Sequence, residues 1–353
     1  PLAACVSRPG PSTLETVQAV PGTQQVKIYA VTTRNRVQPN GNVFDAGKSP
    51  TANYAELTVS VPPGHKLSQV EWPEKKADPK KTFAVVGQAV LDKTTFLNQV
   101  RATEASNEPV GVFVHGYNNN FQEALFRLAQ MSSDMKLHRA PILFSWPSQG
   151  ALSGYVADKE AATYSRDYLA SLLTELATDK GGRDVYLFAH SMGGWLSVET
   201  LRQLKLEGRT DVLARIHVIL AAPDIDADVF RAQMAVIGRM PKPMTILVSG
   251  DDRALAVSKF ISSSSQRVGT LDVKDKVVQA AALANNVQII DISGIQAGDS
   301  SNHNRFADTA ALYPALMARE RKNGVGEAGA FVFDAAAATI SSPFRIVSGA
   351  LRQ

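Results

Sequence analysis

The sequence has one cysteine, no long apolar run and no dense block of charge. Cys5 is the only cysteine among 353 residues, so an internal disulfide is impossible and the fold depends on its core. No uninterrupted apolar run approaches the roughly 18 residues of a membrane-spanning helix. The 37 basic and 33 acidic residues are dispersed, for a net charge of +4, which gives nucleic-acid binding little electrostatic support.

Sequence motifs typical of metal and cofactor binding are also missing. The six histidines lack metal-ligand spacing such as two on one helical turn. Neither a glycine-rich phosphate loop nor a dinucleotide fingerprint occurs. We therefore expect neither a metal nor a cofactor. With 44% hydrophobic and 20% charged residues, the composition is that of an ordinary globular protein.

The first residues suggest an anchor. Leu2-Ala3-Ala4-Cys5 resembles the lipobox of bacterial lipoproteins, in which small residues precede a cysteine that becomes lipidated. The resemblance implies membrane attachment through Cys5 and a place in the bacterial envelope, facing the periplasm. The alternatives are a frayed terminus and a soluble periplasmic or cytoplasmic protein. Residues 6–24, rich in Pro, Gly, Ser and Thr, suit a tether or a disordered start.

From Pro109 onward, short apolar runs alternate with helical patterns. The predicted strands are 110–114, 142–145, 185–189, 216–221, 244–248 and 287–292, with helices from Phe121, Ala161, Gly194, Ala227, Ala254 and Arg305. This alternation predicts an α/β fold with a mostly parallel central sheet and helices on both faces. Two earlier runs, 26–31 and 55–61, are predicted N-terminal edge strands. We expect a tether over 1–24, one domain over 25–323 and a tail over 324–353.

The most informative stretch runs from Val185 to Gly194. An apolar strand ends there at Ser191, which is flanked two residues away by Ala189 and Gly193, and a helix follows. Small residues at those places let neighbouring chain pass close to a sharp strand-to-helix turn that exposes a nucleophilic hydroxyl. A serine in such a turn carries backbone strain of about 1 to 3 kcal/mol, which usually marks function. The alternative is a serine that only caps the helix.

Polar residues follow the other predicted strands. They are His115, Gly116, Tyr117 and Asn118, then Trp146, then Asp224 and Asp226, then Asp251 and Asp252, and last His303. In open parallel sheets, ligands bind outside the carboxyl ends of the strands, so these residues are expected to share one rim with Ser191.

On these residues the chain resembles the α/β-hydrolase superfamily, in which an oxyanion loop, a nucleophile elbow, an acid and a histidine follow in that order. The resemblance spans Val110 to Asn323. The runs FVHGYN (113–118), FSWPS (144–148) and DRAL (252–255) are similar to a bacterial group of α/β hydrolases of unknown function. One departure is Ala189, where the elbow usually has glycine.

The resemblance implies a Ser-His-Asp triad. Ser191 is the expected nucleophile and His303 the expected base, because His115 and His190 belong to other motifs and His65, His138 and His217 lie outside the late loop. The alternative for His303 is a cap on the helix that follows.

The acid and the remaining roles are less sharply defined. Asp252 lies three residues after Ser249, the spacing common in the superfamily, and is the expected acid. Asp251, Asp224 and Asp226 are the alternatives. The resemblance implies that the N–H groups of Met192 and Tyr117 form the oxyanion hole, with Asn118 as the alternative to Tyr117. Trp146 and Tyr155 either wall the substrate pocket or are plain packing.

The sequence therefore predicts a serine esterase that acts on small-molecule carboxylic esters. The connection from Pro223 to Lys242 is short for a cap domain and predicts an open site for short acyl groups, unless residues 258–286 form a cover. The alternatives are a non-catalytic envelope lipoprotein that uses the fold as a binding or scaffolding module, and a thioesterase, amidase or acyltransferase with the same triad.

Overall fold

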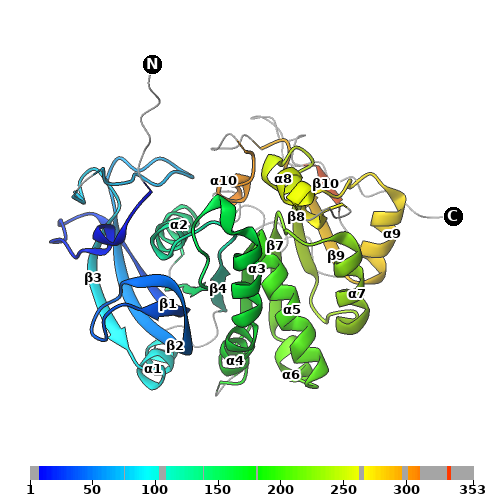
Figure 1. Ribbon diagram of the computed structural model, residues 1–353, viewed down its shortest axis with the longest axis horizontal. Helices are drawn as coiled ribbons and strands as arrows, with labels where there is room; N and C mark the ends of the chain where they lie inside the picture. The colour runs from blue at the N-terminus through cyan, green and yellow to red at the C-terminus, as the bar shows by residue number, and fades with distance from the viewer. Residues whose placement is uncertain are drawn as a thin grey trace.

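The computed structural model describes residues 8–74, 76–102, 109–137, 139–179, 182–261, 266–295, 301–310 and 332–334. Over these residues one ten-stranded sheet runs in the order β10-β9-β8-β7-β6-β4-β5-β1-β2-β3, with helices against both faces (Figure 1). The strands are β1 (Gln24–Arg36), β2 (Phe44–Val61), β3 (Ala84–Leu91), β4 (Val110–Val114), β5 (Ile142–Ser145), β6 (Val185–His190), β7 (Ile216–Ala221), β8 (Met244–Val248), β9 (Val287–Asp291) and β10 (Val332–Asp334).

Helices connect the parallel strands, as the sequence pattern predicts. The helices are α1 (Lys93–Ala102), α2 (Phe121–Asp134), α3 (Tyr155–Tyr164), α4 (Arg166–Ala177), α5 (Met192–Leu206), α6 (Thr210–Leu213), α7 (Ala227–Ile237), α8 (Arg253–Ile261), α9 (Lys276–Ala284) and α10 (Arg305–Ala310), with short 3-10 turns η1 (Pro11–Leu14), η2 (Leu152–Gly154) and η3 (Val268–Thr270). The α/β fold with a mostly parallel central sheet is confirmed.

The N-terminal strands form the antiparallel side of the sheet, but they are not its edge. β1 pairs in parallel with β5 on one side and antiparallel with β2 on the other. The outermost strand on this side is β3, which the sequence analysis did not predict. The central part of β1 is buried without interruption from Ile28 to Thr33, as expected of a strand whose two faces are both covered.

The sheet separates two apolar cores. In β4, Val110, Val112 and Val114 pack on the side of α3, α4 and α5, while Phe113 packs on the opposite side, against α2 and Phe306 of α10. Side chains of a strand alternate between faces, so these five-residue apolar runs contribute to both cores at once.

Two predicted helices differ from the structure in extent. The helix expected from Ala161 begins at Tyr155 and is divided at Ser165, whose hydroxyl donates to the Ala161 carbonyl (2.8 Å). The long helix expected from Arg305 is described only to Ala310. Of the predicted tail over 324–353, the structure describes only β10, which extends the sheet beside β9.

Residues 8–17 are attached to the body, which differs from the expected tether. Leu14 is 2% exposed, and the Gln88 side chain donates to its carbonyl (2.9 Å). The Val17 N–H donates to the Val85 carbonyl (2.9 Å). Cys5 lies outside the described residues, so the anchor and the domain boundaries stay predictions. No helix in the described part of the chain is both long and apolar enough to cross a bilayer.

Candidate active site

Ser191 occupies a strained turn between β6 and α5. Its φ of 53° and ψ of −121° are a conformation that non-glycine residues rarely adopt. Gly193 explains how the turn fits: a Cβ at this position would lie 2.4 Å from the His115 carbonyl oxygen and 2.6 Å from that of Val114. Only glycine lets the start of α5 pass so close to the end of β4.

The loop after β4 lies directly against the turn. A Cβ at Gly116 would lie 3.0 Å from Cβ of Ser191 and 2.8 Å from Nδ1 of His190. Ala189, the departure from the usual elbow pattern, is fully buried in β6, where its methyl group is accommodated. The turn and the predicted oxyanion loop are thus in contact.

His303 and Asp252 are hydrogen-bonded. Nδ1 of His303 lies 2.7 Å from Oδ2 of Asp252, and the Asp252 side chain is fully buried. Its other oxygen, Oδ1, accepts from the Leu255 N–H (3.0 Å) in the first turn of α8. A helix N-terminus stabilises a carboxylate and fixes its orientation.

The alternative acids have other partners. Asp251 receives two hydrogen bonds from Arg305 (2.6 and 2.9 Å), and these lower the pKa of its carboxyl group to about 2. Asp224 lies 3.3 Å from Nε of Arg267 in a buried ion pair. Asp226 caps α7. Among the four candidates, the structure places only Asp252 against the imidazole of His303.

The loop that carries His303 is joined to the loop that carries the acid. Arg305 and Asp251 connect them on one side, and the Arg253 N–H donates to the Ser301 carbonyl (3.0 Å) on the other. Asn302 also donates to the Asp251 carboxylate (3.0 Å). These contacts fix the position of the His303 imidazole relative to the Asp252 carboxylate.

His190 lies beneath His303. The ring centroids are 4.5 Å apart, and Nε2 of His190 lies 3.3 Å from the His303 carbonyl oxygen. Burial, with a contribution from His303, lowers the pKa of His190 well below its usual range. His190 is therefore neutral and supports the backbone of His303. The hydrogen bonds of the described residues do not include one from the Ser191 hydroxyl to His303, so a relay through all three side chains stays a prediction.

Some backbone N–H groups of the predicted oxyanion loop already have acceptors within the protein, and others do not. The N–H groups of Asn118, Asn119 and Asn120 donate to Asp158, Ser148 and Glu123 respectively. In the described part of the chain the Tyr117 N–H donates to no acceptor. The Met192 N–H lies in the first turn of α5, where helical N–H groups lack intrahelical acceptors. This distribution favours Tyr117 over Asn118 as the partner of Met192.

Two buried charged residues hold this loop in place. The Arg34 guanidinium of β1 donates to the Asn119 carbonyl (2.8 Å), the Ser148 carbonyl (3.1 Å) and the Ser145 hydroxyl (3.0 Å), and burial lowers its pKa to about 10. Asp158 of α3 accepts from the Ser148 hydroxyl (2.5 Å) and the Gln149 N–H (2.6 Å). Together they bind the loops after β4 and β5 to each other.

His115 and Trp146 form a stacked, buried pair. Their centroids are 4.9 Å apart, and the Trp146 indole donates to the His115 carbonyl (2.8 Å). Burial and the nearby Arg34 charge lower the pKa of His115 to about 3, so its imidazole is neutral. Trp146 is fully buried, so its ring presents no surface to a substrate and is packing.

Tyr155 lies at the border of the site. Its hydroxyl donates to Asp224 (2.9 Å) and lies 3.2 Å from the Ser258 hydroxyl, and its ring meets the Tyr117 ring edge to face at 5.4 Å. Burial and the neighbouring Asp224 raise the pKa of its phenol to about 12, so the hydroxyl keeps its proton.

Ser191 itself has little exposed surface, 3% of its residue area. The segment that follows α8 is attached to the loop after β7: the Val268 and Gly269 N–H groups donate to the carbonyls of Ile225 and Pro223 (2.9 and 3.0 Å). The open site for short acyl groups and the cover from residues 258–286 both stay predictions.

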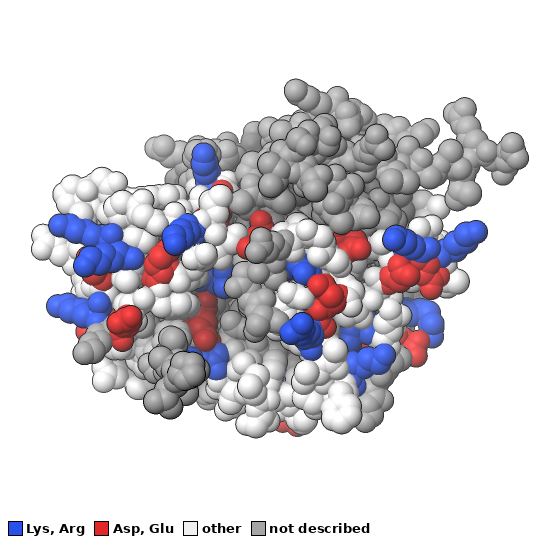
Figure 2. Space-filling model, turned by 90° about the horizontal axis from the view of Figure 1, so that it is seen from above, with Lys and Arg blue, Asp and Glu red and all other residues white. Residues whose placement is uncertain are grey.

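Within the described ranges, no group of three or more His, Cys, Asp or Glu side chains is placed to hold a metal ion. On the face shown in Figure 2, basic and acidic side chains are interspersed. The expectations of no cofactor and no nucleic-acid partner stay predictions.

Sequence reasoning missed the residues that brace the site. Arg34 and Asp158 lie outside every recognised motif, and Arg305 follows the predicted histidine without a distinguishing pattern. The one available signal is positional: Asp158 lies in the first turn of a helix, where the helix N-terminus stabilises a carboxylate.

The strained serine between a strand and a helix, on a mostly parallel sheet, defines an α/β-hydrolase fold. The chain belongs to the family described as alpha/beta hydrolase of unknown function (DUF900), whose sequence model matches residues 91–321. Family and fold support a hydrolase in the broad sense.

Individual relatives are distant. An uncharacterized protein of Nostoc sp., alr1448, is 39% identical over 61 residues, so the match spans 17% of this chain and 16% of that protein's length. The structure of esterase Est22 is 11% identical with a TM-score of 0.40, covering 85% of this chain and 82% of its own. An esterase of Pyrobaculum calidifontis is 12% identical with a TM-score of 0.36, covering 75% and 81%. Likenesses this remote say nothing of the reaction.

Proposed function

We propose that the protein is a serine hydrolase that cleaves carboxylic esters through Ser191, His303 and Asp252. The observation that carries the proposal is the 2.7 Å contact between the His303 imidazole and the buried Asp252 carboxylate, on loops joined to each other beside the strained Ser191 turn. Retention of a strained serine costs about 1 to 3 kcal/mol, which a purely structural role does not require.

In the proposed acylation step, the Ser191 hydroxyl oxygen attacks the ester carbonyl carbon and Nε2 of His303 takes the hydroxyl proton. Asp252 holds the imidazole with its proton on Nδ1 and stabilises the imidazolium. The negative oxygen of the tetrahedral intermediate accepts from the N–H groups of Met192 and Tyr117. When the intermediate collapses, the bond to the alcohol oxygen breaks and Nε2 returns the proton to it.

Deacylation repeats these steps with water in place of the Ser191 hydroxyl. His303 takes a proton from the water as its oxygen attacks the acyl-enzyme carbonyl, and the proton then passes to the Ser191 oxygen as the carboxylic acid leaves. The net change is addition of one water across the ester bond. The positive end of α5 lies at Ser191 and adds to the stabilisation of the oxyanion.

Labelling with a fluorophosphonate probe and turnover of p-nitrophenyl esters test the proposal. The parent should be labelled and active, and both properties should be lost in Ser191→Ala and His303→Ala. Ser197→Ala is the matched control, because Ser197 lies in α5, the helix that follows Ser191, and its buried hydroxyl has no hydrogen-bond partner among the described residues. It should behave as the parent.

The outcomes separate the alternatives. A parent that is neither labelled nor active on any ester refutes the enzyme proposal and leaves a binding or scaffolding module. Labelling without ester turnover, together with turnover of a thioester or an amide, assigns the same serine to a different acyl substrate.

We further propose attachment to the bacterial envelope through lipidated Cys5, which is supported by the Leu2-Ala3-Ala4-Cys5 motif alone. Expression of the full precursor followed by membrane fractionation and mass spectrometry tests it. A protein recovered wholly in the soluble fraction, without lipid on Cys5, refutes the anchor and leaves the hydrolase proposal unaffected.

A further inference from the structure

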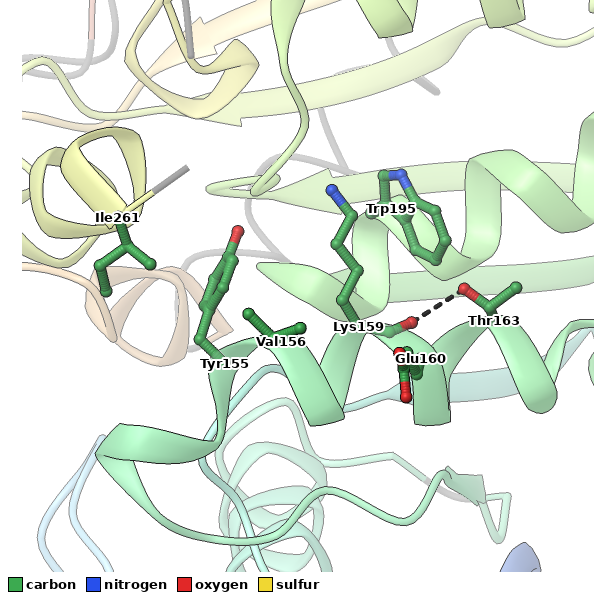
Figure 3. Close-up of a pocket in the computed structure, with 7 residues that line it drawn as sticks. All are labelled: Tyr155, Val156, Lys159, Glu160, Thr163, Trp195 and Ile261. Carbon is green, nitrogen blue, oxygen red and sulfur yellow. Dashed lines mark hydrogen bonds between the residues drawn. The ribbon is translucent and has the colours of Figure 1, made fainter. Parts of the chain in front are cut away.

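A cavity of about 320 Å³ lies between α3, α5 and α8 (Figure 3). The residues that line it are Tyr155, Val156, Lys159, Glu160, Thr163, Trp195 and Ile261. In Figure 3, Tyr155 and Lys159 extend from α3 on the side of Trp195, and Ile261 approaches from α8. Nothing in the proposed acyl-transfer chemistry uses this cavity.

The walls of the cavity are mainly hydrocarbon. The cavity is open to solvent: Val156 on α3 is 68% exposed and Ile261 on α8 is 47% exposed, so two aliphatic side chains remain accessible at its mouth. The Lys159 ammonium lies 5.3 Å above the Trp195 ring, an arrangement that leaves the apolar stem of the lysine along the wall and its charge in water. Exposed apolar walls of this kind favour a hydrocarbon ligand.

The cavity adjoins the candidate nucleophile. Trp195 follows Ser191 by about one turn of α5, a rise of roughly 5 to 6 Å. Tyr155 connects the two sites: its ring contacts Tyr117 of the oxyanion loop, and its hydroxyl donates to Asp224, whose N–H donates to the Ser191 carbonyl (3.1 Å). Tyr155 therefore borders both the predicted oxyanion loop and the cavity.

We propose that this cavity binds the hydrocarbon group of the ester substrate, a linear aliphatic chain or an aryl ring. The proposal rests on the ester-hydrolase function and changes its substrate class, because a cavity of about 320 Å³ accommodates a longer group than the short acyl chain that the 223–242 connection predicts. The group can belong to the acyl or to the alcohol part of the ester.

Two substrate series distinguish these sources. One series is p-nitrophenyl esters with acyl chains from two to ten carbons, and the other is acetate esters of alcohols of increasing length. In the series whose chain enters the cavity, kcat/KM should rise about fourfold for each added methylene until the cavity is full. A flat or falling profile in both series refutes the proposal.

Val156→Glu places a charge on the wall and should reduce the gain per methylene to less than twofold, while activity on the two-carbon ester is retained. Val277→Glu is the matched control: Val156 and Val277 are each the second residue of a helix and are 68% and 76% exposed. The control should keep the parental profile. Equal profiles for the two variants overturn the assignment.

Direct binding separates this proposal from the catalytic one. Octanoate and 1-octanol are titrated into Ser191→Ala while tryptophan fluorescence is recorded, with Ser191→Ala/Trp195→Phe to assign the signal. The probe that binds should change the Trp195 emission, and Val156→Glu should weaken its binding at least tenfold. Binding with these properties in a protein that hydrolyses no ester refutes the hydrolase but not the cavity. Absence of binding, or equal binding in Val156→Glu, refutes the cavity whatever the activity.

Discussion

Asp252→Asn is the substitution whose effect the structure defines most closely. Oδ1 of Asp252 accepts from the Leu255 N–H (3.0 Å), so an asparagine at this position should keep its carbonyl oxygen there. Its NH2 group then takes the place of Oδ2, 2.7 Å from Nδ1 of His303. An amide donor at this point requires Nδ1 to accept, which moves the ring proton to Nε2.

An imidazole with its proton on Nε2 cannot take the proton of the Ser191 hydroxyl. We therefore expect kcat to fall about 10⁴-fold, the loss that a triad with the wrong tautomer shows. This corresponds to about 5.4 kcal/mol at 1.36 kcal/mol per tenfold change in rate. Thermal unfolding should change little, because the N–H of Leu255 keeps its acceptor.

Asp251→Asn is the neighbouring control. It weakens the pairing with Arg305 and leaves the contact between Asp252 and His303 in place. Because the Asp251 side chain is half exposed and an asparagine keeps one acceptor oxygen for Arg305, we expect no more than about a tenfold loss of kcat. Steady-state kinetics on one p-nitrophenyl ester measure both variants. Equal, mild losses, or a larger loss in Asp251→Asn, would refute the assignment of the acid.

Three further predictions concern the framework of the site. Gly193→Ala should lower the free energy of unfolding by about 1 to 3 kcal/mol or more in urea, because the new methyl meets the backbone of His115, whereas Gly111→Ala, with no atom near its new Cβ, should change it little. Arg34→Met should lower the unfolding temperature and reduce kcat more than it changes KM, because the Asn119 carbonyl loses its donor. Arg34→Lys should restore part of the unfolding temperature and part of kcat. Unchanged kinetics would show that Arg34 does not position the loop. The pKa of His115 is about 3 in the folded protein and about 6.5 in the unfolded chain, so the unfolded state binds more protons between these values. The free energy of unfolding should therefore fall by about 1.4 kcal/mol per pH unit from this group as the pH drops through that window. Urea unfolding at a series of pH values should show a shallower slope for His115→Gln, and an unchanged slope would contradict the neutral buried imidazole.

The parallel part of the fold could be read from the sequence because both faces of its strands are buried. β4, β5, β7 and β8 occupy the predicted ranges, since a doubly covered strand is a continuous apolar run with polar ends. β3 was missed because its burial is mixed, with Gln88 and its neighbours exposed at the sheet edge. The order of β1 and β2 was not predictable, because pairing between distant strands depends on tertiary contacts rather than on local pattern.

The candidate site was predictable where chemistry imposes a spacing. Such spacing singles out Ser191 and Asp252; in the structure Ser191 lies in a strained turn and Asp252 lies 2.7 Å from the His303 imidazole, while their catalytic roles stay predictions. The exposure of a side chain has no comparable signal: the sequence allows Trp146 as a pocket wall or as packing, and the structure shows it fully buried. Arg34 carries no local signal, because the partners through which it holds the loops, the Asn119 and Ser148 carbonyls, lie more than 80 positions away along the chain.

The family's sequence model begins at residue 91, after the strand that completes the site. β1 occupies the outer side of β5, and its Arg34 supplies the donors for the Asn119 and Ser148 carbonyls. A truncated chain limited to residues 91–321 would expose β5 as a bare sheet edge that invites association with other chains. Expression of residues 91–321 alone should therefore give aggregated, inactive material, and we expect a segment that folds to begin no later than Gln24.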